Sequence, residues 1–287
     1  MHPELFKIGP FTVYSYGLML GVGFIVASWV VGKELRRRGY DAGLGNTITL
    51  LAIVFGVIGS KLLYVLENLD VFSRSPGILF SPGGLTWYGG FFLAAFAIYL
   101  HARKRKIPFA EVCDSASPAL LLGYGIARIG CHFAGDGDYG TPTDLPWASV
   151  YSNGTYPPSI AFSAFPEIVE KYGVDGVVPD TIPVHPTPIY EFLLGAAGFL
   201  IVMRLAKKAL PAGSLFMVYL VYAGAARFFV EFLRLNPRLL IGLSEAQLIS
   251  AAMIVAGIIG FARISGRMSG RMSGRMSGRD SPTAPGR

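Results

Sequence analysis

The chain has 287 residues, of which 52% are hydrophobic and only 15% are charged. About a quarter of the residues in a soluble domain are charged, so this composition excludes an ordinary soluble domain and predicts a protein embedded in a lipid bilayer. The formal net charge of +7 would suit nucleic acid, but the basic residues lie in short groups between apolar segments. We therefore expect membrane lipid, and no nucleic acid, as a partner.

Seven apolar windows are long enough to cross a bilayer, which takes about 20 residues each. They lie at residues 11–32, 45–66, 84–101, 113–135, 186–206, 213–234 and 243–262. The predicted fold class is therefore an all-α polytopic membrane protein with about seven transmembrane helices, in a membrane domain spanning residues 1–264. The N-terminal sequence MHPELFKIGP lacks the basic stretch and cleavage site of a signal peptide, so we expect the first span to stay in the mature protein.

Basic residues follow every second window. After the first, third, fifth and seventh windows they are Lys33, Arg36, Arg37 and Arg38; Arg103, Lys104, Arg105 and Lys106; Arg204, Lys207 and Lys208; and the arginines at 263, 267, 271, 275 and 279. Cytoplasmic connections of membrane proteins are enriched in lysine and arginine. This alternation predicts an N-terminus outside the cell and a C-terminus in the cytoplasm.

Two segments stand apart from the windows. Residues 136–184 hold seven acidic residues against the single Lys171, and we expect a small extracytoplasmic cap with irregular structure and one short helix near Pro166–Tyr172. This cap would act as a lid over a membrane site, the alternative being a disordered loop. Residues 265–287 contain a repeated Ser-Gly-Arg-Met unit; they predict a disordered tail, acting as a spacer or contacting anionic lipid.

The segment ARIGCHFAGDGDYG, residues 127–140, places Arg128 and His132 where the fourth window ends and Asp136 and Asp138 just beyond it. An arginine inside an apolar span is costly and usually faces the bundle interior with a partner or a ligand. The alternative is that the long side chain of Arg128 extends its charged group to the membrane interface, and that the residues after it form an ordinary turn.

With this orientation, polar side chains of six windows gather at one depth, beneath the outer headgroups. They are Tyr14, Tyr16, Lys61, Tyr64, Trp87, Tyr88, Arg128, His132, His185, Tyr190, Glu191, Arg227 and Glu231. Singly, each has a structural explanation, such as an interfacial aromatic belt or a structural pair one helical turn apart. The cytoplasmic half of the predicted bundle holds ionisable groups only at its edge. This asymmetry predicts one polar site open to the outer leaflet.

The residue types of this site indicate its chemistry. It combines three cations with four carboxylates: Lys61, Arg128, Arg227, Glu191, Glu231, Asp136 and Asp138. Arginine binds phosphate through two parallel donors, and a phosphate within the outer leaflet belongs to a phospholipid headgroup. The sequence has no Ser-His-Asp arrangement, HExxH motif or phosphate-binding Walker loop. Direct transfer from the lipid to an acceptor outside therefore fits best.

These residues resemble those of a known family. ARIGCHFAGDGDYG resembles the signature of the bacterial prolipoprotein diacylglyceryl transferases, Gly-Arg-Ile-Gly-Asn-Phe-Ile-Asn-Gly-Glu-x-x-Gly. The sequence HPTPIYE at 185–191 resembles the family's His-Pro-Ser-Gln-Leu-Tyr-Glu, and RFFVEFLR at 227–234 resembles its Arg-x-x-x-Glu-Phe-x-Arg. Tyr16-Gly17-Leu18-Met19 and the pair Gly89-Gly90 also match, and all matches run in the family's order.

The resemblance implies a multi-pass protein of the bacterial cytoplasmic (inner) membrane that moves the diacylglyceryl group of phosphatidylglycerol onto the lipobox cysteine of a secreted prolipoprotein. Glycerol 1-phosphate leaves, and neither a metal nor another cofactor is expected. Arg128 and Arg227 would hold the phosphate and stabilise its charge, Glu231 would orient Arg227, and Tyr16 would contact the lipid head. Further substrate contacts are expected from Lys61, Gly89, Gly90, His132, Asp136, Asp138, Gly140, His185, Tyr190 and Glu191.

The sequence departs from the family pattern near the expected chemistry. Cys131 and Ala134 replace the two signature asparagines, and Tyr88 stands where the family has a histidine proposed as a base. A tyrosine hydroxyl, with a pKa of about 10, is a poor base at neutral pH. We therefore favour Tyr88 as a positioning donor in the catalytic group, with His132, His185 or direct supply of a thiolate from solvent as alternatives.

Other departures concern the loop and the cysteines. The loop before Gly140 is one residue longer than in the family, so either Asp136 or Asp138 is a candidate for the family glutamate. The family tyrosine four residues before Arg227 is Ala223, with Tyr222 one place earlier. The acceptor thiol belongs to the substrate, so neither cysteine of this chain, Cys113 or Cys131, is expected to be a nucleophile. On one helix they would lie about 27 Å apart, too far for a disulfide.

Two other functions are compatible with a membrane site of this kind. A family paralogue would transfer or bind a lipid with a different acceptor, and Tyr88 and Cys131 are the residues that would favour it. A lipid or anion transporter would place polar residues through the full depth of the bundle and would show inverted repeats or broken helices. The apolar inner half and the lack of a repeated half in the sequence argue against a transporter.

Overall fold

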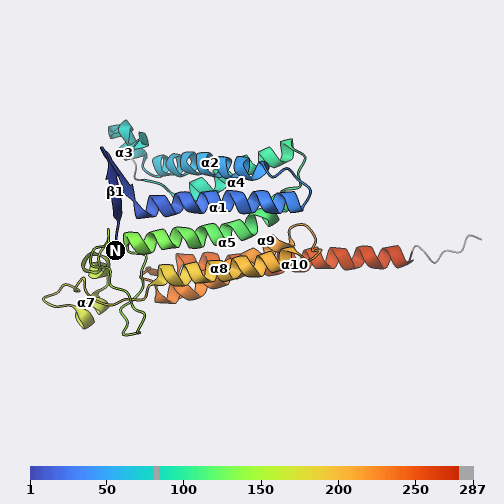
Figure 1. The fold of residues 1–287 in the computed structure, drawn as a ribbon. Helices are drawn as coiled ribbons and strands as arrows, with labels where there is room; N and C mark the ends of the chain where they lie inside the picture. Colours follow the sequence, from blue (N-terminus) through green and yellow to red (C-terminus); the bar gives the residue numbers. More distant parts are fainter. Residues whose placement is uncertain (81–83, 278–287) are drawn as a thin grey trace, which may run out of the picture.

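A bundle of long helices forms the body of the protein (Figure 1). The computed structural model describes residues 1–80 and 84–277, and within these ranges seven helices have at least 17 residues. They are α1 (Ser15–Arg37), α2 (Leu44–Glu67), α4 (Trp87–Lys104), α5 (Phe109–Ala134), α8 (Thr187–Ala206), α9 (Ser214–Val230) and α10 (Glu245–Ser277). Each of these helices overlaps in sequence with one of the seven predicted apolar windows.

Five segments of the described residues are long and apolar enough to cross a membrane: Ser15–Arg37, Leu44–Glu67, Thr187–Ala206, Ser214–Leu233 and Glu245–Gly266. This agrees with a polytopic membrane protein. The other two long helices are more polar. Helix α4 ends with the basic residues His101, Arg103 and Lys104, and α5 contains Glu111, Asp114 and Arg128. Helix α5 packs against α1, α8 and α9, and α4 packs against α2, so α5 keeps its polar groups inside the bundle.

The predicted start of the first span at residue 11 is too early. Residues Phe11–Tyr14 form β2, which pairs antiparallel with β1 (Glu4–Ile8), and α1 begins only at Ser15. An apolar run of four residues does not distinguish a strand from a helix, and here pairing with β1 decides in favour of the strand. Figure 1 shows this hairpin at the same end of the bundle as the residues that follow α5.

Close backbone contacts hold α4 against α2. A Cβ placed on Gly89 would lie 2.3 Å from the backbone oxygen of Gly59, and one placed on Gly59 would lie 2.3 Å from the backbone oxygen of Gly89. Only residues without a side chain permit two helices to approach so closely. This contact positions the first turn of α4, which contains Tyr88.

At the end of the bundle where α5 and α9 begin and α1 ends, Asp114 contacts three helices. Its carboxylate accepts hydrogen bonds from the backbone N–H groups of Gly213 and Phe216, both at 2.8 Å, at the start of α9. Arg38, which follows α1, pairs with Asp114 at 3.3 Å and also with Glu111. A carboxylate that receives the unpaired donors of a helix start stabilises that start. The polar residues of α5 at this end are thus structural.

Residues 136–184 pack around a small hydrophobic core of their own. It consists of Tyr139, Tyr151, Ala161, Phe162, Val178 and Val184. The segment contains α6 (Pro158–Ala161), η2 (Phe162–Ala164) and α7 (Pro166–Tyr172), so the predicted short helix is confirmed. Each fully buried aromatic side chain stabilises such a core by about 1.5–3 kcal/mol, which explains why this loop adopts a defined structure.

Shorter elements complete the chain. They are α3 (Leu69–Arg74), η1 (Pro76–Phe80), η3 (Glu231–Leu233) and the paired strands β3 (Arg238–Leu240) and β4 (Leu243–Ser244). Helix α10 continues through the three complete Ser-Gly-Arg-Met units at residues 265–276 to Ser277, whereas the sequence predicted disorder from residue 265. Extending an existing helix costs far less than starting one, which accounts for the difference. Residues 278–287 of the predicted tail lie outside the described residues.

Candidate active site

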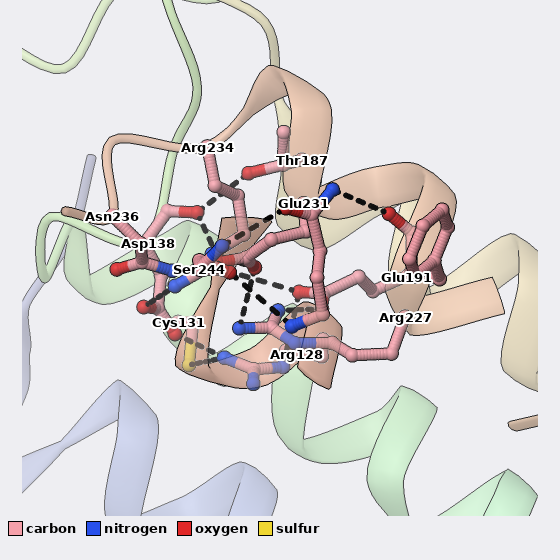
Figure 2. A network of polar contacts seen from close by, with 12 residues as sticks. Arg128, Cys131, Asp138, Thr187, Glu191, Arg227, Glu231, Arg234, Asn236 and Ser244 are labelled. Carbon is pink, nitrogen blue, oxygen red and sulfur yellow. Dashed lines mark hydrogen bonds and ion pairs between the residues drawn. The ribbon is translucent and has the colours of Figure 1, made fainter. Parts of the chain in front are cut away.

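Glu191 brings two arginines from different helices together (Figure 2). Its Oε2 lies 3.1 Å from Nε of Arg128 on α5, and its Oε1 lies 2.7 Å from Nη1 of Arg227 on α9. The side chain of Glu191 is only 3% exposed, whereas those of Arg128 and Arg227 are 18% and 25% exposed. The carboxylate therefore fixes both guanidinium groups from the buried side, and part of each arginine remains accessible.

Glu231 holds Arg227 from a second direction. Its Oε2 lies 2.9 Å from Nη2 of Arg227, and its Oε1 accepts hydrogen bonds from Asn236 (2.6 Å) and Ser244 (2.7 Å). The side chain of Glu231 is completely buried. With one carboxylate at each terminal nitrogen, the guanidinium plane of Arg227 has a defined orientation, which agrees with the orienting role predicted for Glu231.

Asp138 anchors the residues after α5 to the same network. Its carboxylate pairs with Arg128 and Arg234, and its backbone oxygen accepts hydrogen bonds from Thr187 (2.5 Å) and Arg234 (3.0 Å). Burial by itself would raise the pKa of the Asp138 carboxyl, but Arg234 and Arg128 outweigh burial and hold this pKa below its ordinary value. Asp138 is thus ionised at neutral pH.

The neighbouring Asp136 has a different environment. Burial raises the pKa of its carboxyl, and the nearby charge of Asp138 raises it further. The sequence left open whether Asp136 or Asp138 takes the place of the family glutamate. The described ion pairs with arginine are made by Asp138, so the geometry favours Asp138.

Sequence reasoning missed Arg234 and Tyr124, which both contact Glu191. Arg234 lies 3.4 Å from Glu191 and pairs with Asp138, and the Tyr124 hydroxyl donates to Glu191 at 2.6 Å while its ring lies 4.8 Å below the guanidinium of Arg128. A signal for each was present, since Arg234 ends the RFFVEFLR motif and Tyr124 lies one helical turn before Arg128. Within the described residues, the network thus joins three guanidiniums to three carboxylates.

A cavity of about 520 Å³ opens onto this network between α4, α5, α8, α9 and α10. Its charged end is formed by Arg128, Glu191 and Arg227. The rest of its wall is mainly apolar or aromatic, formed by Trp87, Leu120, Leu121, Leu194, Tyr219, Ala223 and Met253, among others. A ligand with an anionic head and apolar chains suits this cavity, because its head would meet the charged residues and its chains the apolar wall.

The two histidines predicted near the site lie in another cavity. This cavity, of about 750 Å³, is lined by His132, His185, Trp147 and Tyr190, among others. His132 Nδ1 lies 2.8 Å from the Tyr151 hydroxyl, and His185 Nδ1 lies 3.3 Å from the Tyr190 hydroxyl. Burial lowers the pKa of His185, which keeps that ring neutral at pH 7.

Tyr88 faces a third cavity, of about 410 Å³, which it lines together with Glu231, Ser244 and Glu245. Its hydroxyl donates a hydrogen bond to the carboxylate of Glu245, the first residue of α10. Glu245 was not among the predicted site residues, because no spacing in the sequence links it to Tyr88. In the structure Tyr88 thus donates to Glu245, and its role as a positioning donor in the reaction stays a prediction.

The remaining predicted residues differ in their surroundings. Gly89 and Gly90 pack against α2, where a Cβ on Gly90 would lie 2.3 Å from the Ser60 hydroxyl oxygen, and Gly140 donates its backbone N–H to the His185 carbonyl. These contacts give the glycines a structural reason, and their contact with substrate stays a prediction. Tyr16 packs its backbone against Gly130, and the Lys61 ammonium lies 5.7 Å from the Tyr64 ring centroid. Cys113 and Cys131 have free thiols, as predicted.

The fold and the site together define a polytopic membrane protein in which buried arginine–carboxylate pairs meet an apolar cavity. Comparison with known proteins identifies the family. A family model described as prolipoprotein diacylglyceryl transferase matches residues 3–263. The chain therefore belongs to the prolipoprotein diacylglyceryl transferase family.

Individual relatives cover nearly the whole chain. The phosphatidylglycerol–prolipoprotein diacylglyceryl transferase of Clostridium tetani is 30% identical over 263 residues, which are 91% of this chain and 97% of that protein. The protein of the same name from Proteus mirabilis is 32% identical over 270 residues, 90% of each chain. The one from Bacillus mycoides is 30% identical over 255 residues, 88% of each chain.

Proposed function

We propose that this protein transfers the diacylglyceryl group of phosphatidylglycerol to the thiol of the lipobox cysteine of a secreted prolipoprotein and releases glycerol 1-phosphate. The observation that carries this proposal is the cavity of about 520 Å³ in which Arg128 and Arg227 lie at one end of an apolar wall. The diacyl chains fit the apolar wall, and the phosphodiester fits the two guanidiniums. The family and the names of the relatives support the same reaction.

The site acts on the leaving group. The thiolate of the acceptor attacks the glyceryl carbon, an S–C bond forms, and the C–O bond to phosphate breaks with its electron pair left on the phosphate oxygen. The phosphate thereby gains one negative charge. Arg128 and Arg227 are held in place by Glu191 and Glu231 before the reaction begins, so they stabilise that charge without reorganisation. From the sequence, His132 and His185 are candidate acceptors of the thiol proton, Tyr88 is favoured as a positioning donor, and a thiolate supplied by solvent is the further alternative.

We place the site toward the outer leaflet of the bacterial cytoplasmic membrane, with seven spans, the N-terminus outside and the C-terminus in the cytoplasm. The alternation of basic connections supports this orientation. The β1–β2 hairpin and the 136–184 segment lie at one end of the bundle, and α10 projects past the other (Figure 1). The 136–184 segment is then a cap outside the membrane, adjacent to the incoming prolipoprotein.

The test uses purified protein in liposomes that contain phosphatidylglycerol, together with a synthetic peptide carrying a lipobox cysteine. The expected product is a peptide whose mass increases by one diacylglyceryl group in thioether linkage. A peptide with serine in place of the cysteine, and liposomes of phosphatidylethanolamine alone, should give no product. Absence of the thioether, under conditions in which the Proteus mirabilis relative forms it, would refute the proposal.

A second candidate is transfer to an acceptor other than a lipobox thiol. Tyr88 favours it, because it stands where the family pattern has a histidine. Consumption of phosphatidylglycerol with release of glycerol 1-phosphate, but without a peptide thioether, would support this second candidate.

A further inference from the structure

Tyr88 and Glu245 form a pair that the sequence does not suggest. They lie 157 positions apart, yet the hydroxyl of Tyr88 near the start of α4 donates to the carboxylate of Glu245 at the start of α10. A carboxylate in the first turn of a helix is stabilised by the helix dipole. Both side chains are exposed and line the cavity of about 410 Å³, so a substrate group that enters this cavity can reach them.

This cavity adjoins the arginine site. Glu231 lines the cavity and also pairs with Arg227 at 2.9 Å. Ser244, the residue before Glu245, donates to Glu231 at 2.7 Å, and Trp87, the residue before Tyr88, lines the arginine cavity. Glu231 therefore links the cavity that contains Tyr88 to Arg227.

Among the described groups near the reacting end, Glu245 is the one placed to accept a proton through Tyr88. The Glu231 carboxylate in the same cavity is occupied by Arg227, Asn236 and Ser244. His132 and His185 line the cavity of about 750 Å³, in which Glu231 is not among the described wall residues. Their Nδ1 atoms lie 2.8 and 3.3 Å from the hydroxyls of Tyr151 and Tyr190. A phenol that donates its proton to a carboxylate still has lone pairs with which to accept another proton.

We propose that the Glu245 carboxylate is the proton acceptor of the transfer reaction and is reached through the hydroxyl of Tyr88; this rests on the function proposed above. The S–H bond of the acceptor breaks and its proton goes to the Tyr88 oxygen, while the Tyr88 proton goes to Glu245. The sulfur electron pair forms the S–C bond, and the pair of the broken C–O bond stays on the leaving phosphate. Glu245 then releases its proton to solvent.

The charged and titratable groups around the pair come from several elements. Within the described part of the chain, Tyr88 comes from α4, Glu231 from η3 and Glu245 from α10. Arg227 pairs with Glu231, and Arg238 of β3 donates to Gln247, two residues after the start of α10, at 2.7 Å. Since Glu231 is paired with Arg227, Glu245 is the carboxylate of this cavity that receives the Tyr88 hydrogen bond.

The experiment compares wild type with Glu245→Gln in phosphatidylglycerol liposomes and measures thioether formation as a function of pH. The glutamine can still accept the Tyr88 hydrogen bond but cannot take up a proton. We expect kcat at pH 7 to fall by about 10²–10⁴-fold, with KM for phosphatidylglycerol unchanged. The deficit should shrink as the pH approaches about 8.5, where a free thiol ionises without a base.

Three further variants separate this role from a structural one. Glu245→Asp keeps a carboxylate and should recover part of the activity, and Tyr88→Phe should match Glu245→Gln, with the double variant no slower than either. The control is Glu67→Gln, because Glu67 also accepts a hydroxyl hydrogen bond, from Thr86 at 3.1 Å, and should keep wild-type activity.

A Glu245→Gln variant with the wild-type rate and pH profile would overturn the inference while leaving the proposed function intact. So would a loss that is equal in Glu245→Gln and Glu245→Asp and independent of pH. If the wild type itself forms no thioether, the proposed function fails, and this inference fails with it.

Discussion

Replacing Arg227 by lysine keeps one positive charge in the network but removes the planar pair of donors. In the structure Nη1 lies 2.7 Å from Glu191 and Nη2 lies 2.9 Å from Glu231, and these carboxylates are 3% and 0% exposed. A single ammonium cannot reproduce this two-sided geometry. Losing one preorganised donor to transition-state charge costs about 2.7–4 kcal/mol. This corresponds to a fall in kcat/KM of about 100–1000-fold, reduced to about tenfold where the lysine still reaches the phosphate.

The assay is thioether formation in phosphatidylglycerol liposomes at matched protein levels, with thermal unfolding of the detergent-solubilised protein as the check on folding. Arg128→Lys should behave in the same way, because Arg128 lines the same cavity. Arg74→Lys is the matched control, since Arg74 is exposed at the end of α3, and it should keep wild-type activity. Near wild-type turnover in both Arg128→Lys and Arg227→Lys would refute the reasoning and show that these arginines are structural.

Three other predictions follow from packing, charge and topology. Gly89→Ala should destabilise the protein by about 1–3 kcal/mol, because the added Cβ would meet a backbone oxygen at 2.3 Å. The control is Gly56→Ala, whose Cβ meets nothing within 4 Å and which should not lower the unfolding temperature. The lowered pKa of Asp138 means that its contribution to stability is present above the ordinary aspartate pKa of about 3.9 and is lost as the pH falls through the lowered pKa. Asp138→Asn should remove this part of the pH dependence of the unfolding free energy in denaturant titrations. An unchanged pH dependence would contradict the prediction. In a cysteine-free background, Asn153→Cys should react with an impermeant thiol reagent in intact cells and Lys104→Cys should not; the reverse pattern would overturn the placement of the site in the outer leaflet.

The helical architecture and part of the site could be predicted from the sequence because their causes are local. Each long helix overlaps an apolar window. The hydrogen bonds of a helix join residues only four apart, so an apolar window that becomes buried can form a helix without distant partners. Arg128 and Arg227 could be predicted because an arginine within an apolar span needs a partner. Glu231 could be linked to Arg227 because the two lie one turn apart on one face.

The rest depended on which helix ends meet, and that is a property of the packed bundle. Asp138 rather than Asp136 pairs with the arginines, and Glu191 joins Arg128 to Arg227 across three helices. Glu245 meets Tyr88 only because α4 and α10 begin at the same end of the bundle. Partners of this kind are many residues apart, and no periodicity in the chain encodes their distance. The sequence by itself determined the membrane class, the helices and the family, whereas the tertiary structure decided which charges face one another and thus which groups share a cavity.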